Sequence, residues 1–300
     1  MTSVLEHLLT EQPNPASEGI DARPTEEILR VINQEDRQVP EAVRGVIPAI
    51  ARAVDAIVAR LRSGGRLFYL GAGTSGRLGA LDAAECPPTF NVPPDLVQGI
   101  IAGGEPALAR ATEVSEDDPA TGARDLVGRG FTASDVLVGI AASGRTPYVL
   151  GAVAEARRLG ALAIGISCTP DSELSRAVDI ALEPLPGPEI IAGSTRMKAG
   201  TATKLVLNML STAAMIRLGC VYGNLMVNLQ PRNEKLRDRA RRIIAQAAGV
   251  DAGCAAELLD ASGGAVRTAI VMARLGLSRE QAEARLAACG GRISETLKDG

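Results

Sequence analysis

The spacing of apolar residues changes along the chain, and with it the predicted secondary structure. Between residues 25 and 62 apolar side chains recur every three or four positions, which is the period of an amphipathic helix. Thr25 is expected to be the N-cap of a first helix, and Pro40 is expected to open a longer one that ends near Arg62. The preceding residues 1–24 are rich in Pro, Glu, Ser and Asn and are expected to form an extended arm.

From Arg66 onward, short apolar runs alternate with helical stretches. Several runs, such as 136–142, are apolar without interruption, which is typical of strands covered on both faces in a parallel sheet. About 20–30 residues per unit fits right-handed strand–helix–strand crossovers. The pattern predicts an α/β fold, a three-layer sandwich around a mainly parallel five-stranded sheet. The expected strands are 66–70, 96–101, 135–141, 161–167 and 179–184, and the clearest helices between and after them are 147–159 and 197–218.

After Gly223 the strand pattern stops, and a small C-terminal helical domain is expected. A basic helix should run from Asn233 to about Ala248, and Ser278 with Gln281 has the spacing of a capping box. Three shorter helices are expected near 252–260, 264–275 and 278–288. The predicted domains are therefore an N-terminal arm and helix (1–50), an α/β domain (51–223) and a helical domain (224–300).

Composition narrows the classes of function. Aromatic residues are 2% of the 300 residues and the net charge is -3, which argues against binding to nucleic acid or to an anionic membrane. The five cysteines are widely spaced and lack any metal-binding spacing, so buried free thiols in a reducing cytoplasm and no metal are expected. No signal peptide or membrane span is evident. His7 is the only histidine and is expected at the surface, so chemistry must run without histidine.

One glycine-rich turn is the first candidate site. The apolar run Leu67–Leu70 ends in Gly71-Ala-Gly-Thr-Ser-Gly76, and good helix formers follow from Arg77 to Glu85. A strand, a tight turn and a helix N-terminus make an anion-binding site. The same spacing is used by dinucleotide-binding proteins, which also need an acidic residue about 20 residues later. The second strand ends at 101–104 without an acid, so the sequence disfavours NAD or NADP.

A second and a third loop repeat this chemistry. The third predicted strand ends in Ala141-Ala-Ser-Gly-Arg-Thr-Pro147, and Gly193–Lys198 opens a later helix. Loops that lead from parallel strands into helices meet in one crevice, so we expect a site for a compact phosphate monoester. The simpler alternative is that these hydroxyls are ordinary helix caps. The expected substrate-binding residues are Thr74, Ser75, Gly76, Arg77, Ser143, Gly144, Arg145, Thr146 and Ser194.

The loops resemble those of the sugar isomerase (SIS) domain, a phosphosugar-binding module with a flavodoxin-like sheet. The block 71–90 resembles N-acetylmuramic acid 6-phosphate etherases more closely, as do segments 139–148, 194–202 and 223–227. The resemblance implies a cytoplasmic homodimer without metal or organic cofactor. It also implies a lyase that converts N-acetylmuramic acid 6-phosphate and water to N-acetylglucosamine 6-phosphate and D-lactate, a step of peptidoglycan recycling and amino-sugar metabolism.

Cleavage of that ether requires a base for the C2 proton and an acid for the departing oxygen, so carboxylates are the natural candidates. The resemblance places the proton donor at Glu85, whose mostly apolar neighbours could raise its pKa, and the second catalytic residue at Glu116. The segment around Glu116 matches less closely, so Glu113 and Asp117 remain rivals.

The position of Glu85 raises a geometric difficulty. In a straight helix it would lie about 15 Å beyond Ser75, farther than a sugar phosphate needs. Either the helix breaks early, near Gly79, or Glu85 serves the phosphate site of the other subunit, and we favour the shared site.

Two other functions fit the same loops. One is a SIS-fold aldose–ketose phosphosugar isomerase, which would not explain the block around Glu85. The other is a non-catalytic phosphosugar sensor, like the glucokinase regulatory protein, which has no need of both carboxylates. Release of D-lactate from N-acetylmuramic acid 6-phosphate separates the three.

Overall fold

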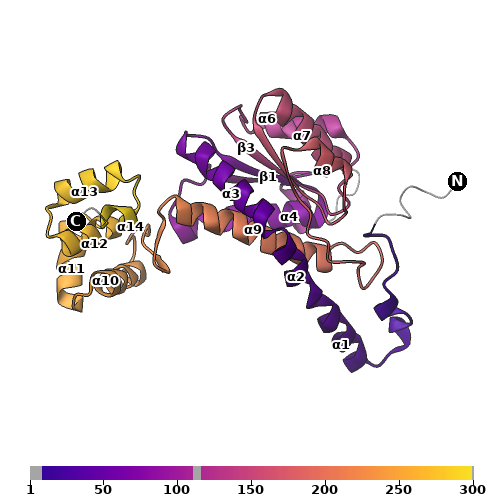
Figure 1. The fold of residues 1–300 in the computed structure, drawn as a ribbon, viewed down its shortest axis with the longest axis horizontal. Helices are drawn as coiled ribbons and strands as arrows, with labels where there is room; N and C mark the ends of the chain where they lie inside the picture. The colour runs from indigo at the N-terminus through magenta and orange to yellow at the C-terminus, as the bar shows by residue number, and fades with distance from the viewer. Residues whose placement is uncertain (1–8, 111–115, 299–300) are drawn as a thin grey trace. The chain divides into compact units, whose positions relative to one another are not determined.

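A computed structural model describes residues 9–110 and 116–298 (Figure 1). His7 and Glu113 lie outside the described residues, so the expectations for them stay open. By compactness the chain divides into two units, each described here by itself. The first comprises Met1–Ala84 with Pro94–Ser211, and the second comprises Glu85–Pro93 with Thr212–Gly300. The domain boundaries predicted at residues 50 and 223 stay predictions.

The first unit is built on a parallel sheet. Among the described residues it has five strands in the order β2-β1-β3-β4-β5, which is the flavodoxin-like order. Register runs unbroken along the central pair, from Leu67 opposite Val136 to Gly71 opposite Ile140. All five predicted strands and the predicted fold class are confirmed. The strands are β1 (Leu67–Gly71), β2 (Val97–Ile101), β3 (Val136–Ile140), β4 (Leu162–Ile166) and β5 (Ile180–Leu182).

Helices cover both faces of this sheet, which explains the uninterrupted apolar runs (Figure 1). Phe68 and Leu70 point to one face and share a buried cluster with Tyr148 and Val149 of α7. Tyr69 points to the other face, where it meets Gly79 of α4. The two residues are packed so closely that a Cβ atom added to Gly79 would lie only 2.8 Å from the Tyr69 Cβ. The helices are α3 (Ile47–Arg62), α4 (Gly73–Phe90), α5 (Pro106–Ala109), α6 (Pro119–Gly128), α7 (Pro147–Arg158), α8 (Glu173–Ala177) and α9 (Lys198–Arg217).

The N-terminal segment differs from the prediction in three ways. Thr25 is the first residue of α1 (Thr25–Asp36) and not its cap, because Pro24 holds the N-cap position. The single long helix expected from Pro40 is wrong: α2 (Gln38–Gly45) ends at Gly45, Val46 caps it, and α3 begins with Pro48 in its first turn. Proline lacks the N–H that would continue the earlier helix, so the break follows from Pro48. The described part of the arm is not extended throughout, since it holds short 3₁₀ helices η2 (Pro15–Ser17) and η3 (Ile20–Ala22).

Helix α4 is longer than predicted at both ends. It begins at Gly73, inside the glycine turn, and continues through Pro87 and Pro88 to Phe90. The early break considered at Gly79 is therefore wrong, because the helix passes straight through that residue. The helix begins in the first compact unit, and its last residues, from Glu85, belong to the second.

The second unit has its own apolar core among small helices. The core includes Ile244, Leu259 and Ile270, each at most 1% exposed. Ser278 and Gln281 form the predicted capping box. A short hairpin of β6 (Val221–Tyr222) and β7 (Leu225–Met226) was not predicted, because two-residue strands carry no periodicity. The helices are α10 (Glu234–Ala248), α11 (Ala252–Ala261), α12 (Val266–Leu275), α13 (Arg279–Ala288) and α14 (Ile293–Thr296), of which the last was also not predicted.

Candidate active site

The candidate site lies in the first unit, where the strand order of the sheet reverses direction. Strands β1 and β3 are neighbours but not consecutive, so the chain leaves them toward opposite sides. Crevices at the carboxyl ends of such strands are the usual ligand sites of parallel sheets. The loops after Gly71 and after Ile140, which the sequence singled out, both start at this point.

The first loop depends on close backbone packing. A Cβ added at Gly71 would lie 2.8 Å from the amide nitrogen of Gly76 and 3.0 Å from the carbonyl oxygen of Ile140. Gly73 has a φ of +52°, which L side chains rarely adopt. Thr74 and Ser75 are part-exposed in the first turn of α4, where backbone N–H groups have no partner within the helix. The turn therefore presents two hydroxyls and the positive end of a long helix.

The guanidinium of Arg77 is engaged in holding a neighbouring segment. Its Nε donates to the carbonyl oxygen of Leu108 at 3.2 Å, and its Nη2 donates to that of Arg110 at 3.0 Å. Arg77 thereby ties the chain after β2 to the start of α4. A contact from Arg77 to a phosphate stays a prediction.

The second loop places Ser143–Thr146 at the end of β3. Gly144 has a φ of +68°, and a Cβ there would lie 2.2 Å from the Cβ of Ser172. The Ser143 Oγ accepts a hydrogen bond from the backbone N–H of Arg145 at 3.4 Å. Thr146 is at the N-cap position of α7, yet its side chain makes no capping hydrogen bond. The alternative that these hydroxyls serve only as helix caps therefore does not hold for Thr146.

A cluster of hydroxyls beneath this loop was not predicted. The Ser172 Oγ lies 3.1 Å from that of Ser167 and 2.8 Å from that of Ser175. Ser172 also caps α8 by accepting from the N–H of Ser175 at 3.1 Å. The sequence did carry one sign of this cluster. Ser167 directly follows β4, so it lies at the edge of the sheet formed by the carboxyl ends of the strands, like the glycine turn and Ser143.

The start of α9 meets the first loop. A Cβ added at Gly200 would lie 3.5 Å from the Thr74 Cγ2 and also 3.5 Å from the carbonyl oxygen of Thr195. The part-exposed Ser194 directly precedes Thr195. The structure therefore brings the third hydroxyl segment next to the glycine turn.

A buried ionic network supports the start of α9. The Lys198 ammonium is 0% exposed and donates to the Glu35 Oε2 at 2.7 Å. Asn14 donates to the same oxygen at 2.8 Å. The Glu189 carboxylate accepts from the backbone N–H groups of Lys198 and Ala199, at 2.9 and 3.0 Å. Burial tends to raise the pKa of Glu35, but hydrogen bonds from Lys198 and Asn14 outweigh it, so the net shift is downward.

Glu116 lies against the glycine turn. A Cβ added at Gly73 would be 3.4 Å from the Glu116 Oε1, so the carboxylate reaches the start of α4. The Glu116 carbonyl oxygen accepts from the backbone N–H of Tyr148 at 3.0 Å, which fixes this segment to α7. Its rival Asp117 is exposed, and its rival Glu113 lies outside the described residues.

Glu85 has surroundings that differ from the prediction. Its side chain is exposed in the single chain, so apolar neighbours do not bury it as the sequence suggested. The reason is that Ala83 and Cys86, which flank it, turn inward on α4 while Glu85 turns outward. It stands ten residues after Ser75 on an uninterrupted helix, a rise of about 15 Å.

Asp82, one turn before Glu85, was missed by sequence reasoning. It is 4% exposed, and its Oδ1 lies 3.5 Å from the Lys204 Nζ on α9. Burial raises the pKa of Asp82, partly offset by a hydrogen bond from Ser211 and the charge of Lys204. Asp82 is placed to hold α4 against α9 in the first unit.

Models of two domain families match this chain. The glucokinase regulatory protein N-terminal SIS domain matches residues 49–157, and the SIS domain matches residues 115–213. Among solved structures, a phosphoheptose isomerase from Neisseria gonorrhoeae is similar, with 18% identity and a TM-score of 0.49. The match covers 63% of this chain and 98% of the isomerase.

Curated relatives match over nearly the whole length. An N-acetylmuramic acid 6-phosphate etherase from Aeromonas hydrophila is 55% identical, over 98% of this chain and 99% of the relative. The chain belongs to the N-acetylmuramic acid 6-phosphate etherase family. A further etherase, from Symbiobacterium thermophilum, is 58% identical over 89% of each chain. The family predicted from the residues is therefore confirmed.

Membership in the etherase family leaves the individual residue roles as predictions. No helix among the described residues is long and apolar enough to cross a membrane. Nor do the described residues contain a group of three or more His, Cys, Asp or Glu side chains arranged to hold a metal ion.

Proposed function

We propose that this chain cleaves the lactyl ether of N-acetylmuramic acid 6-phosphate with water, giving N-acetylglucosamine 6-phosphate and D-lactate. It would thus be a carbon–oxygen lyase of amino-sugar metabolism in peptidoglycan recycling. Membership in the etherase family supports the substrate and the reaction. The single structural observation that carries the proposal is the Glu116 carboxylate beside Gly73, in the glycine turn at the point where the strand order reverses.

The loops would hold the 6-phosphate. Thr74 and Ser75 offer hydroxyls at the N-terminus of α4, and the Ser143–Thr146 loop offers more from the adjacent strand. The positive end of the α4 dipole favours an anion there. Ser194 would complete this set from the segment that lies beside Thr74. No metal or organic cofactor enters the proposed reaction.

The chemistry would be an elimination followed by an addition. The ring-opened C1 aldehyde acidifies the C2 proton, Glu116 removes that proton, and Glu85 protonates the lactate oxygen as the C3–O bond breaks. Water then adds at C3 of the unsaturated intermediate while the carboxylates reverse roles, so a proton returns to C2. The oxygen of water would end on C3 of the sugar, and D-lactate would keep the ether oxygen.

A homodimer would bring Glu85 to the substrate. Glu85 is exposed and lies about 15 Å along α4 from the glycine turn. In a homodimer its carboxylate would therefore act on substrate bound by the other subunit. We place the enzyme in the cytoplasm. The support is that none of the five cysteines, all of which lie among the described residues, forms a disulfide, as expected in a reducing compartment, although Cys254 and Cys289 are only part-buried.

D-lactate release tests the function directly. The chain is incubated with N-acetylmuramic acid 6-phosphate in H₂¹⁸O or in D₂O. We expect D-lactate without ¹⁸O, and a sugar phosphate that carries ¹⁸O at C3 or deuterium at C2. Absence of D-lactate together with a raised melting temperature would instead support a phosphosugar sensor. Isomerised sugar phosphate without D-lactate would support an isomerase.

Residue roles are tested by Glu85→Ala. Turnover should be abolished while binding of the sugar phosphate survives, because the proposal assigns Glu85 to the lactate oxygen and the hydroxyl loops to the 6-phosphate. Asp117→Ala tests the rival of Glu116 and should keep its turnover if Glu116 is the second catalytic residue. Unchanged turnover in Glu85→Ala would remove Glu85 from the mechanism.

Sharing between subunits is tested by mixed dimers. Subunits with Glu85→Gln are mixed with subunits that carry Ser75→Ala and Ser143→Ala. If the site is shared, each mixed dimer regains one intact site, and activity rises above that of either parent. No recovery in dimers shown to have exchanged subunits would contradict sharing and leave the reaction itself untouched.

A further inference from the structure

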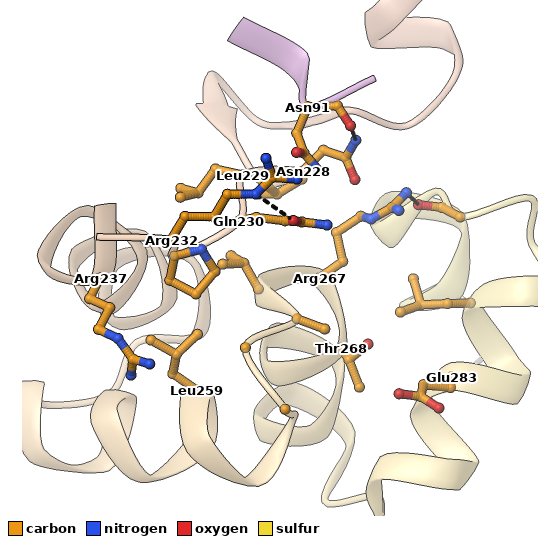
Figure 2. A pocket seen from close by; sticks show the side chains of 18 of the residues that line it. Asn91, Asn228, Leu229, Gln230, Arg232, Arg237, Leu259, Arg267, Thr268 and Glu283 are labelled. Carbon is orange, nitrogen blue, oxygen red and sulfur yellow. Dashed lines mark hydrogen bonds between the residues drawn. The ribbon is translucent and has the colours of Figure 1, made fainter. Parts of the chain in front are cut away.

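The second unit contains a cavity that the proposed reaction does not use. Its volume is about 800 Å³, within the range of small-molecule pockets. All of its lining residues belong to Glu85–Pro93 or Thr212–Gly300. Figure 2 shows that guanidinium, amide and hydroxyl groups line much of it.

The cavity has more positive than negative charge. Arg232, Arg237 and Arg267 line it from the loop before α10, from α10 and from α12. Arg237 is 3.8 Å from the carboxylate of Asp260, and the other lining acid, Glu283, is bound at 2.8 Å by an arginine outside the lining. Within the described parts of the chain, no carboxylate forms an ion pair with Arg232 or Arg267. Two permanent cations therefore lack an ion-pair partner among residues 9–110 and 116–298.

Arg267 lines the cavity and is fixed there by a hydrogen bond to the backbone. Its Nη1 donates to the carbonyl oxygen of Gly291 at 3.4 Å, a long contact that leaves the other guanidinium hydrogens for a ligand (Figure 2). Gly291 has a φ of +74°, and a Cβ there would lie 2.8 Å from that Nη1. Because Gly291 has no Cβ, the Arg267 guanidinium can pack directly against the backbone at this position.

The N-terminus of α12 opens onto the same space. Gly263 and Gly264, with φ of +67° and +85°, turn the chain into α12, and Ala265 at the N-cap supplies no side-chain hydrogen bond. Independently, Thr268 in the first turn is 95% buried by the protein and lines the cavity. Its hydroxyl has no hydrogen-bond partner among the described residues. A polar group in a side chain that has lost most of its contact with bulk water gains from a ligand that hydrogen-bonds to it.

We propose that this cavity binds a phosphate monoester with a polar body, at a site separate from the glycine turn of the first unit. Arg267, the first turn of α12 and the Thr268 hydroxyl would hold the phosphate. Arg232 would contribute the second positive charge, and the side chain of Gln230, beside it at 3.0 Å, would meet hydroxyl groups of the body. The volume accommodates a monosaccharide phosphate.

Calorimetric titration of the full chain tests this site. Inorganic phosphate and N-acetylglucosamine 6-phosphate are the probes, and unphosphorylated N-acetylglucosamine is the negative probe. We expect two phosphate sites per chain in the wild type, one of which survives in the Ser75→Ala, Ser143→Ala variant. In that background Arg267→Gln should weaken binding by about tenfold or more, through loss of a charge-assisted contact.

Two further variants make the result specific. Arg274→Gln removes the same charge from the same helix outside the cavity, where Arg274 donates a hydrogen bond to the carbonyl oxygen of Ala247 at 3.3 Å. It should leave affinity within about twofold. Thr268→Val keeps the side-chain shape and should weaken binding even if Arg267→Gln folds poorly.

The outcomes separate this site from the proposed reaction. Loss of all phosphate binding in the folded Ser75→Ala, Ser143→Ala variant overturns the cavity site and leaves the etherase proposal standing. The cavity site is also overturned if Arg267→Gln and Arg274→Gln weaken the remaining phosphate binding equally. In that case the affinity depends on the net charge of the protein and not on a residue in the cavity. Equal binding of unphosphorylated N-acetylglucosamine or of D-lactate contradicts recognition of a phosphate monoester.

Discussion

Replacement of Lys198 by Met should destabilise the first unit far more than loss of an ordinary ion pair. Lys198 and Glu35 are 0% and 8% exposed, and their charged atoms are 2.7 Å apart. Removing one partner of a buried pair leaves an uncompensated charge and typically costs about 3–5 kcal/mol. For a unit of this size we expect the melting temperature to fall by about 6–20 °C.

The matched control is Arg30→Met. Arg30 and Glu26 also form an ion pair, at 2.5 Å, but their side chains are 75% and 76% exposed. An exposed pair contributes about 0–1 kcal/mol, so this variant should melt within about 2–3 °C of the wild type. Thermal unfolding of both variants is measured by circular dichroism at pH 7 and again at pH 5.

The pH dependence gives the sharper test. In the wild type the pKa of Glu35 is lowered, so its contribution to stability is present above the unfolded value of about 4.3 and is lost as pH falls through the folded pKa. In Lys198→Met, burial without the ammonium should raise the pKa of Glu35, which then accepts a proton on acidification. The deficit relative to the wild type should therefore be smaller at pH 5 than at pH 7. The reasoning is refuted if Lys198→Met costs no more than Arg30→Met, or if its deficit is the same at both pH values.

Two further predictions concern packing and thiol reactivity. Gly151→Ala should destabilise by about 1–3 kcal/mol in urea unfolding, because the new Cβ would lie 1.9 Å from the carbonyl oxygen of Pro119 in α6. Gly128→Ala, on the facing helix with nothing within 4 Å of the added Cβ, should be neutral or stabilising, and equal effects of the two would contradict this account. Burial raises the pKa of Cys168 to about 12, so iodoacetamide at pH 8 should label the part-buried Cys254 but not Cys168 in the folded chain. Mass-spectrometric labelling of Cys168 at the rate of Cys254 would show that this region opens readily.

The sequence predicted those features that depend on local pattern. Runs such as Val136–Ile140 are apolar at every position because both faces of the sheet are covered, so each strand was found where it lies. The capping box at Ser278 is likewise encoded within four residues. The order of the strands, in contrast, arises from packing between segments far apart in the chain.

Failures of prediction have identifiable physical causes. Pro48 divided a predicted helix because its own missing N–H outweighed the apolar period on either side. Helix α4 continues through Pro87 and Pro88, although proline usually ends or kinks a helix. The Lys198–Glu35 ion pair joins residues 163 positions apart in the sequence. No local sequence pattern around either residue indicates that the two meet. The hydroxyl loops were found because strand ends are local signals, but the exposure of Glu85 depends on which side of a helix faces the core.

The division of the chain limits how this protein can be cut or rearranged. The second unit is assembled from two separate pieces, Glu85–Pro93 and Thr212–Gly300, and the Asn228 Nδ2 joins them by donating to the carbonyl oxygen of Phe90 at 2.6 Å. A gene truncated after residue 211 would leave Glu85–Pro93 without the rest of its compact unit, including the Asn228 amide that binds Phe90. The helical unit is therefore no detachable tail. Recombination that exchanges it between relatives must carry the end of α4 along, so the two parts of the chain are expected to be inherited together.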